Sequence, residues 1–164
     1  MTKRVAYCAM LTALAMIFGY VEALIPFGFG IPGIKLGIAN IVIVLALYML
    51  PAYQALLIQL ARIVLVSFLF GNMAMMIYSL AGGILSFFAM LLLKKAKGFS
   101  ITGVSIAGGV SHNIGQLAVA VLTVQNVRIA FYAPVLLIAG LLTGCLIGML
   151  AYRVKPVIDK VGRH

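Results

Sequence analysis

Residues 73–93 read MAMMIYSLAGGILSFFAMLLL, a run without a single charged side chain. At about 1.5 Å per residue, a helix of this length measures about 32 Å, close to the bilayer hydrocarbon thickness of about 30 Å. Lys94 and Lys95 follow directly. An apolar run of this length that ends in basic residues predicts a transmembrane helix whose last turn lies at the cytoplasmic face.

The composition of the whole chain agrees with this stretch. Of the 164 residues, 65% are hydrophobic and 9% are charged, and the mean hydropathy is +1.25. Soluble domains are about half apolar and about a quarter charged, so the polar side chains here are too few to cover a globule in water. Only two residues are acidic, Glu22 and Asp159. The sequence therefore predicts an all-α integral membrane protein.

Similar apolar runs, separated by proline, glycine or basic residues, predict a single transmembrane domain over residues 1–164, formed by a bundle of six helices. The range expected for the second helix is short for a full span, so a re-entrant hairpin formed with the third helix is a second interpretation. The expected helices cover residues 5–25, 34–50, 52–70, 73–93, 102–124 and 129–152.

The basic residues predict the orientation of the bundle. The formal net charge is +10, and nine of the 12 Lys and Arg residues fall in three short segments. By the positive-inside rule, we expect a multi-pass protein of the plasma membrane with both termini in the cytoplasm. No aromatic residues are interleaved with these charges, which argues against a nucleic-acid partner. The three segments contain Lys3 and Arg4, then Lys94, Lys95 and Lys97, then Arg153, Lys155, Lys160 and Arg163.

Gln59 and Arg62 share one face of a predicted helix, near the middle of the bilayer. An arginine there costs about 2.5–3.5 kcal/mol on insertion scales, so it is expected to face the bundle or a water-filled cavity rather than lipid. We expect Arg62 to contact a ligand. The alternative is a structural role, in which Arg62 caps carbonyl groups of a neighbouring helix or pairs with Glu22.

His112, Asn113 and Gln116 form a second polar patch, because spacings of three and four residues place them on one helix face. Three strongly polar side chains within two turns suggest the lining of a ligand site or pore. An interhelical hydrogen-bond network is the alternative. Metal binding is not expected, since neither a second histidine nor an acidic cluster lies nearby in the sequence.

Further polar residues fall toward the outer ends of the predicted helices. Taken singly, each suits an interfacial anchor or a turn. Together with Arg62 and His112 they make the outer half of the bundle cationic, which favours an anionic ligand such as a carboxylate, a phosphate or a diphosphate. These residues are Lys35, Asn40, Asn72, Tyr78 and Arg128.

Several catalytic and cofactor-binding classes are excluded. The sequence has no G-x-x-x-x-G-K-[ST] motif for binding ATP. One aspartate and one glutamate cannot supply the paired carboxylates that hold Mg²⁺ on a diphosphate. Glu22 and Asp159 are expected at opposite ends of the bundle, which leaves no Ser–His–acid set. We therefore expect a protein that is not an enzyme and carries no cofactor.

Small residues recur at helical spacing, which lets helices approach closely in lipid. Packing within the bundle is the ordinary interpretation of each stripe, and contact with a partner subunit is the other. The stripes are Ala9 and Ala13; Ser79, Gly82, Gly83 and Ser86; and Gly140, Gly144 and Gly148.

Three segments carry a resemblance to a known family: PGIKLGIANI (32–41), YSLAGGILS (78–86) and SIAGGVSHNIGQ (105–116). They resemble the membrane family described as heptaprenyl diphosphate synthase component I, also called the Gx transporter family, over essentially the whole chain. That family is similar to the S subunits of energy-coupling factor transporters. S subunits are six-helix proteins that capture a micronutrient from outside and dock onto a shared membrane subunit driven by two ATPases.

The resemblance implies roles for individual residues. Ala9 and Ala13 match the Ala-x-x-x-Ala surface on which S subunits dock to the shared subunit. The ligand site is implied toward the outer side, with Arg62 as a neighbouring candidate. The residues that match this site are Lys35, Asn72, His112, Asn113 and Gln116.

Three functions stay open at this point. The favoured one is an S subunit that captures a small anionic micronutrient, or an isoprenoid- or quinone-related ligand. The alternative is a non-catalytic membrane partner subunit of a prenyl diphosphate synthase, and the third is a stand-alone channel or carrier. The Asp-rich motifs of prenyl diphosphate synthases are absent from this sequence, so the resemblance does not imply catalysis by this chain.

Overall fold

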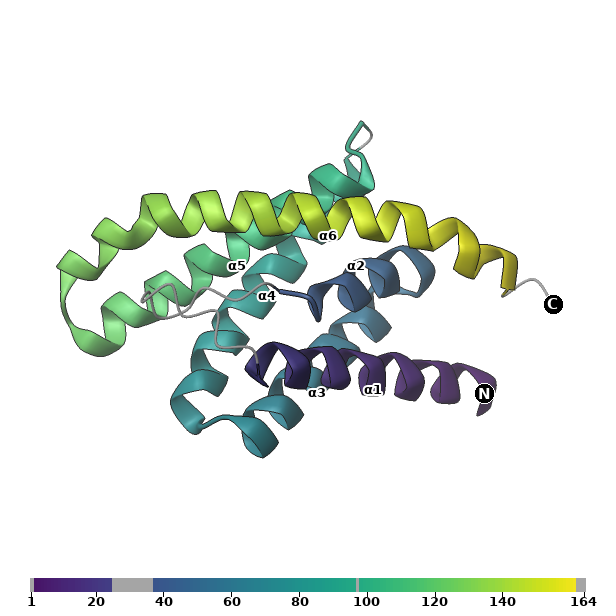
Figure 1. Ribbon diagram of the computed structural model, residues 1–164, viewed down its shortest axis with the longest axis horizontal. Helices are drawn as coiled ribbons and strands as arrows, with labels where there is room; N and C mark the ends of the chain where they lie inside the picture. Colours follow the sequence, from purple (N-terminus) through teal and green to yellow (C-terminus); the bar gives the residue numbers. More distant parts are fainter. Residues whose placement is uncertain (1, 25–36, 97, 162–164) are drawn as a thin grey trace.

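The computed structural model describes residues 2–24, 37–96 and 98–161, which form a helical bundle (Figure 1). No strand occurs among these residues, which confirms the all-α prediction. Five helical segments are long and apolar enough to cross a membrane, and α2 is shorter. The protein is therefore a multi-pass membrane protein. Its elements are α1 (Thr2–Leu24), α2 (Asn40–Met49), α3 (Ala52–Phe70), α4 (Met73–Lys95), α5 (Ile101–Val124), the 3-10 helix η1 (Val127–Tyr132) and α6 (Ala133–Val161).

The largest helix interfaces join α5 to α6 and α4 to α5, followed by α1 with α3 and α3 with α4. The helix α6 runs back along the bundle, so its end and the beginning of α1 lie at the same end of the molecule (Figure 1).

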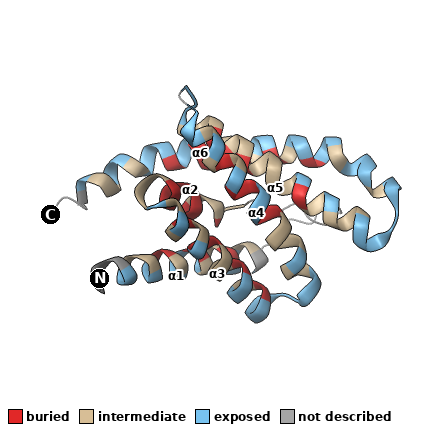
Figure 2. Ribbon diagram, turned by 180° about the vertical axis from the view of Figure 1, so that it is seen from behind, coloured by how far each residue is buried: buried red, intermediate tan, exposed pale blue. Residues whose placement is uncertain are grey.

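The short helix α2 lies inside the bundle. It has 10 residues, and Val42 through Leu47 are all buried. It contacts α1, α3 and α6, and Figure 2 shows it as a largely buried element. Near its C-terminal end, the carbonyl oxygen of Leu47 accepts a hydrogen bond of 2.5 Å from Lys94 Nζ of α4. A helix that is apolar all round suits a position surrounded by protein.

Glycines bring α5 and α6 into backbone contact. A Cβ on Gly109 would collide with the carbonyl oxygen of Gly140, and a Cβ on Gly144 would lie 2.7 Å from the Cα of Ile106. Gly148 is similarly close to α5. The stripe of small residues predicted on α6 therefore packs within the bundle, as is common for helices in lipid.

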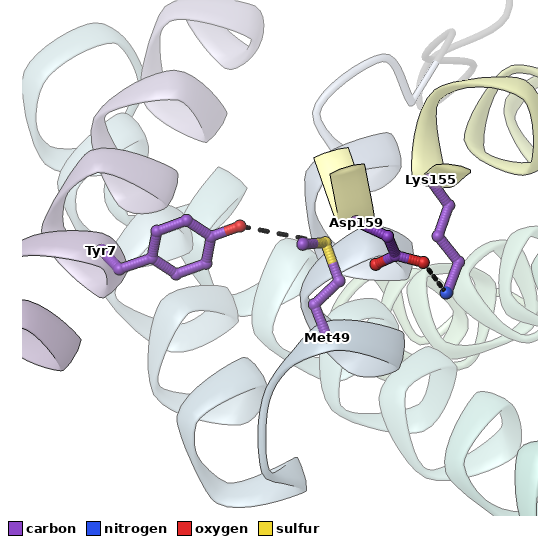
Figure 3. Close-up of polar contacts among 4 residues, drawn as sticks. All are labelled: Tyr7, Met49, Lys155 and Asp159. Carbon is purple, nitrogen blue, oxygen red and sulfur yellow. Dashed lines mark hydrogen bonds and ion pairs between the residues drawn. The ribbon is translucent and has the colours of Figure 1, made fainter. Parts of the chain in front are cut away.

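Polar contacts also occur at the end of the bundle where α1 begins (Figure 3). The Tyr7 hydroxyl donates to Met49 Sδ at 3.9 Å, which links α1 to α2. Lys155 and Asp159, one turn apart on α6, form an ion pair of 2.6 Å. The carboxylate of Asp159, one of the two in the chain, is thus paired with Lys155, away from the cavity described below.

Two helices, α2 and α6, differ clearly in their boundaries from the sequence predictions. The helix expected over 34–50 begins at Asn40 among the described residues, because Gly37 has a φ of +67° and its carbonyl accepts from the Asn40 N–H in a turn. The helix expected over 129–152 is preceded by η1, begins at Ala133 and continues to Val161. Proline is tolerated in a first helical turn, which suits Pro134.

Candidate functional site

A polar cavity of about 80 Å³ lies among the helices. One water needs about 10–15 Å³ on this measure, so the cavity has room for several waters or a small polar group. The residues that each helix contributes are mostly three or four apart, which places them on one helix face. They include Arg62, Ile63, Val66 and Ser67 of α3 and Gly109, His112 and Asn113 of α5.

Arg62 is held at the cavity wall by acceptors from two helices. Its Nη2 donates to Gln59 Oε1 at 3.0 Å and to Asn40 Oδ1 at 3.4 Å. Gln59 is fully buried one turn earlier on α3, and Asn40 is the first residue of α2. The Nε of Arg62 is buried and has no acceptor among the residues that the structure describes. A ligand oxygen that accepts from this Nε would remove the cost of an unsatisfied charged donor.

Glu22 brings a carboxylate to the same cavity. It lies in the last turn of α1, and its Oε1 accepts a hydrogen bond from the backbone N–H of Gly37. Glu22 and Arg62 also interact electrostatically. The ionisable side chains of the described lining are therefore Glu22, Arg62 and His112. With a neutral imidazole, their formal charges cancel.

Two residues of the predicted α5 patch line the cavity, and the third does not. His112 and Asn113 are lining residues. Asn113 Nδ2 also donates to the carbonyl oxygen of Leu136 on α6 at 2.7 Å, so Asn113 makes an interhelical hydrogen bond as well. Gln116 instead packs on α4, where a Cβ on Gly82 would lie 2.9 Å from its Cγ.

The other predicted site residues have different positions. Asn72 is exposed and caps α4, since its Oδ1 accepts from the Met75 N–H at 2.8 Å, as N-cap residues do. Tyr78 is half-buried and does not line the cavity. Lys35 lies outside the described residues, so its place in the site stays a prediction. The cavity thus brings together Asn40, Arg62, His112 and Asn113 from the set that the sequence predicted.

Sequence reasoning missed the hydroxyl groups of the lining, Ser67, Ser79 and Thr143. Thr143 Oγ1 donates to the carbonyl oxygen of Ala139 in its own helix at 2.9 Å. Single hydroxyls are common in membrane helices, so Ser79 and Thr143 give no signal in the sequence. Ser67 follows Arg62 by five residues, a spacing that does not place two side chains on one helix face, so it gave no signal either. Glu22 was expected as a counter-charge but not as a lining residue.

Ala9 and Ala13 are exposed on α1. Among the residues of α1 whose burial is described, the buried ones are Leu11, Ala15 and Gly19, which form a stripe at four-residue spacing on a different face. The pair therefore lies outside the packing of the bundle, and its role in docking stays a prediction.

A family model described as heptaprenyl diphosphate synthase component I matches residues 11–154. The chain belongs to this family. No curated protein and no solved structure matches the chain. Membership in the heptaprenyl diphosphate synthase component I family confirms the family that the three sequence motifs indicated, and the family is described as one component of a synthase. The family match does not show the similarity to S subunits.

Proposed function

We propose that this protein is a non-catalytic membrane partner subunit of a prenyl diphosphate synthase, and that its cavity binds the anionic head group of an isoprenoid-related ligand. The observation that carries this proposal is Arg62, an arginine inside a membrane-spanning helix on the wall of a polar cavity. An arginine in this environment is costly, and such residues usually serve a ligand or a transport path. The family match supplies the link to isoprenoids.

The acidic residues of the chain support a non-catalytic role. Enzymes that act on diphosphates commonly hold Mg²⁺ through carboxylates. This chain has two acidic residues, and of these Asp159 is paired with Lys155 on α6. The transfer reaction is therefore assigned to a partner, and this subunit is proposed to hold an apolar ligand at the membrane.

The experiment that tests this function is purification of the tagged protein from its native membrane, with bound molecules and proteins identified by mass spectrometry. A prenyl-carrying or quinone-related anion, recovered with a soluble prenyl-transferring enzyme, is the expected result. Recovery of a shared membrane subunit and ATPases, with a water-soluble micronutrient, would contradict it and assign the protein to uptake.

Uptake as an S subunit of an energy-coupling factor transporter is the second candidate function. The exposure of both Ala9 and Ala13 favours it, because a docking surface must lie outside the bundle. This function would require a shared transmembrane subunit and two ATPases as partners.

Ala9→Trp tests this surface. The substitution is expected to abolish copurification with a membrane partner, because the indole would hold two helices apart, while ligand affinity and melting temperature stay unchanged. Ala15→Trp is the control, since Ala15 is fully buried and overpacking there costs about 1–3 kcal/mol. If Ala9→Trp lowers melting temperature and ligand affinity together, Ala9 belongs to the internal packing.

The orientation in the plasma membrane is also a proposal, with the basic segments and both termini in the cytoplasm. Cysteines introduced at Asn126 and Ala96, both exposed, test it in a chain whose Cys8 and Cys145 are replaced by alanine. A membrane-impermeant thiol reagent applied to intact cells is expected to label position 126 and not position 96. Labelling at position 96 alone would show that the protein has the opposite orientation in the membrane.

A further inference from the structure

We infer that the cavity selects a singly charged carboxylate head group over a diphosphate, with Glu22 as the residue that sets this preference. The inference rests on the proposed function in one respect, the use of the cavity for an anion. It goes further by naming the class of anion.

The charges of the lining residues that the structure describes favour a singly charged anion. Arg62 contributes one positive charge and Glu22 one negative charge, and His112 can add one positive charge by protonation. A single negative charge on the ligand then balances the group. A diphosphate brings at least two, and the excess would face Glu22 in surroundings where charges are poorly screened.

The position of Glu22 relative to Arg62 is fixed by the turn that precedes α2. Glu22 Oε1 accepts from the Gly37 N–H, and the Gly37 carbonyl accepts from the Asn40 N–H at 2.8 Å. Asn40 Oδ1 in turn accepts from Arg62. The two charges are thus joined through one short segment of chain, so the carboxylate cannot easily move away when an anion approaches Arg62.

The donor available at Arg62 suits an anionic oxygen. Gln59 and Asn40 already accept from Nη2, whereas the buried Nε has no described acceptor. A carboxylate oxygen can accept from this Nε, as a phosphate oxygen also can, so the choice between the two depends on charge. The side chains of Ser67 and Ser79 add neutral hydroxyls to the lining, which do not compensate the further charges of a diphosphate.

The test compares ligands that share one apolar chain and differ in the head group: farnesol, farnesoic acid, farnesyl phosphate and farnesyl diphosphate. Dissociation constants are measured on the full-length protein in lipid nanodiscs. We expect the wild type to bind farnesoic acid at least about tenfold more tightly than farnesyl diphosphate, as one unfavourable charge pair predicts. Glu22→Gln keeps an acceptor for Gly37 and removes the charge, and is expected to reduce this preference about tenfold.

Asp159→Asn is the matched control, because it removes the other acidic residue, which lies outside the cavity and pairs with Lys155. It is expected to leave the preference unchanged. A wild type that prefers the diphosphate, or a Glu22→Gln variant with the wild-type preference, would overturn the inference while the proposed function stands.

A second pair of probes tests the preference for a single charge separately from the isoprenoid function. If no farnesyl compound binds, the isoprenoid function is wrong, and benzoate and inorganic pyrophosphate are compared by thermal stabilisation. Stabilisation of the wild type by benzoate alone, and of Glu22→Gln by both, would sustain the inference without the isoprenoid function. If neither probe stabilises the protein, both the inference and the proposed anion-binding function are wrong.

Discussion

Arg62→Ala is expected to weaken binding of the best-bound farnesyl anion about ten- to a hundredfold. A hydrogen bond to a charged group is worth about 1.5–3 kcal/mol, and each 1.4 kcal/mol is tenfold in affinity. Isothermal titration in nanodiscs measures the affinity, and the melting temperature without ligand is recorded beside it.

Arg128→Ala is the matched control for charge, since Arg128 lies exposed on η1 and does not line the cavity. Its affinity is expected to equal that of the wild type. Unchanged affinity in Arg62→Ala with a large fall in melting temperature would make Arg62 a structural tie between α2 and α3 through Asn40 and Gln59. Gln59→Leu would then reproduce much of the fall.

Gly109→Ala is expected to have the largest effect on stability among single-methyl additions to α5. Its Cβ would collide with the carbonyl oxygen of Gly140, and a backbone atom cannot move aside as a flexible side chain can. Overpacking of this kind costs about 1–3 kcal/mol. Chemical unfolding in detergent measures the change in the free energy of unfolding.

Gly103→Ala is the control on the same helix. A Cβ there would lie 3.6 Å from Ser100 Oγ, an ordinary contact. Because alanine has a higher helix propensity than glycine, this variant is expected to be as stable as the wild type or up to about 1 kcal/mol more stable. Equal stability of the two variants would show that α5 and α6 separate at little cost.

The positions of the long helices followed from the sequence because each depends on a local property, the length of an apolar run. The expected ranges 52–70 and 73–93 agree closely with α3 and α4. The beginning of α2 did not follow, since it depends on the positive φ of Gly37, which hydropathy does not record. The extension of α6 to Val161 was missed because Lys155 and Pro156 look like the end of a span.

The candidate site was predictable only where a polar residue is unusual in its helix. Arg62, His112 and Asn113 stand out against apolar neighbours, and all three line the cavity. Gln116 stands out equally but packs against Gly82 of α4. Periodicity places Gln116 on the same face as His112, and only the approach of α4 decides which of them reaches the cavity. Contacts between helices are set by the whole bundle, so the sequence pattern alone could not separate them.

The central position of α2 has a consequence for how the chain is made. A helix of 10 residues measures about 15 Å, half the hydrocarbon thickness, so it is a poor substrate for insertion as an independent span. Its burial depends on α6 as well as on α1 and α3, and α6 leaves the ribosome after α1, α2 and α3. We therefore expect α2 to reach its final place only after α6 has been synthesised. Chains arrested before α6 should then keep α2 accessible to proteases or chaperones, even when their longer helices have already inserted into the membrane.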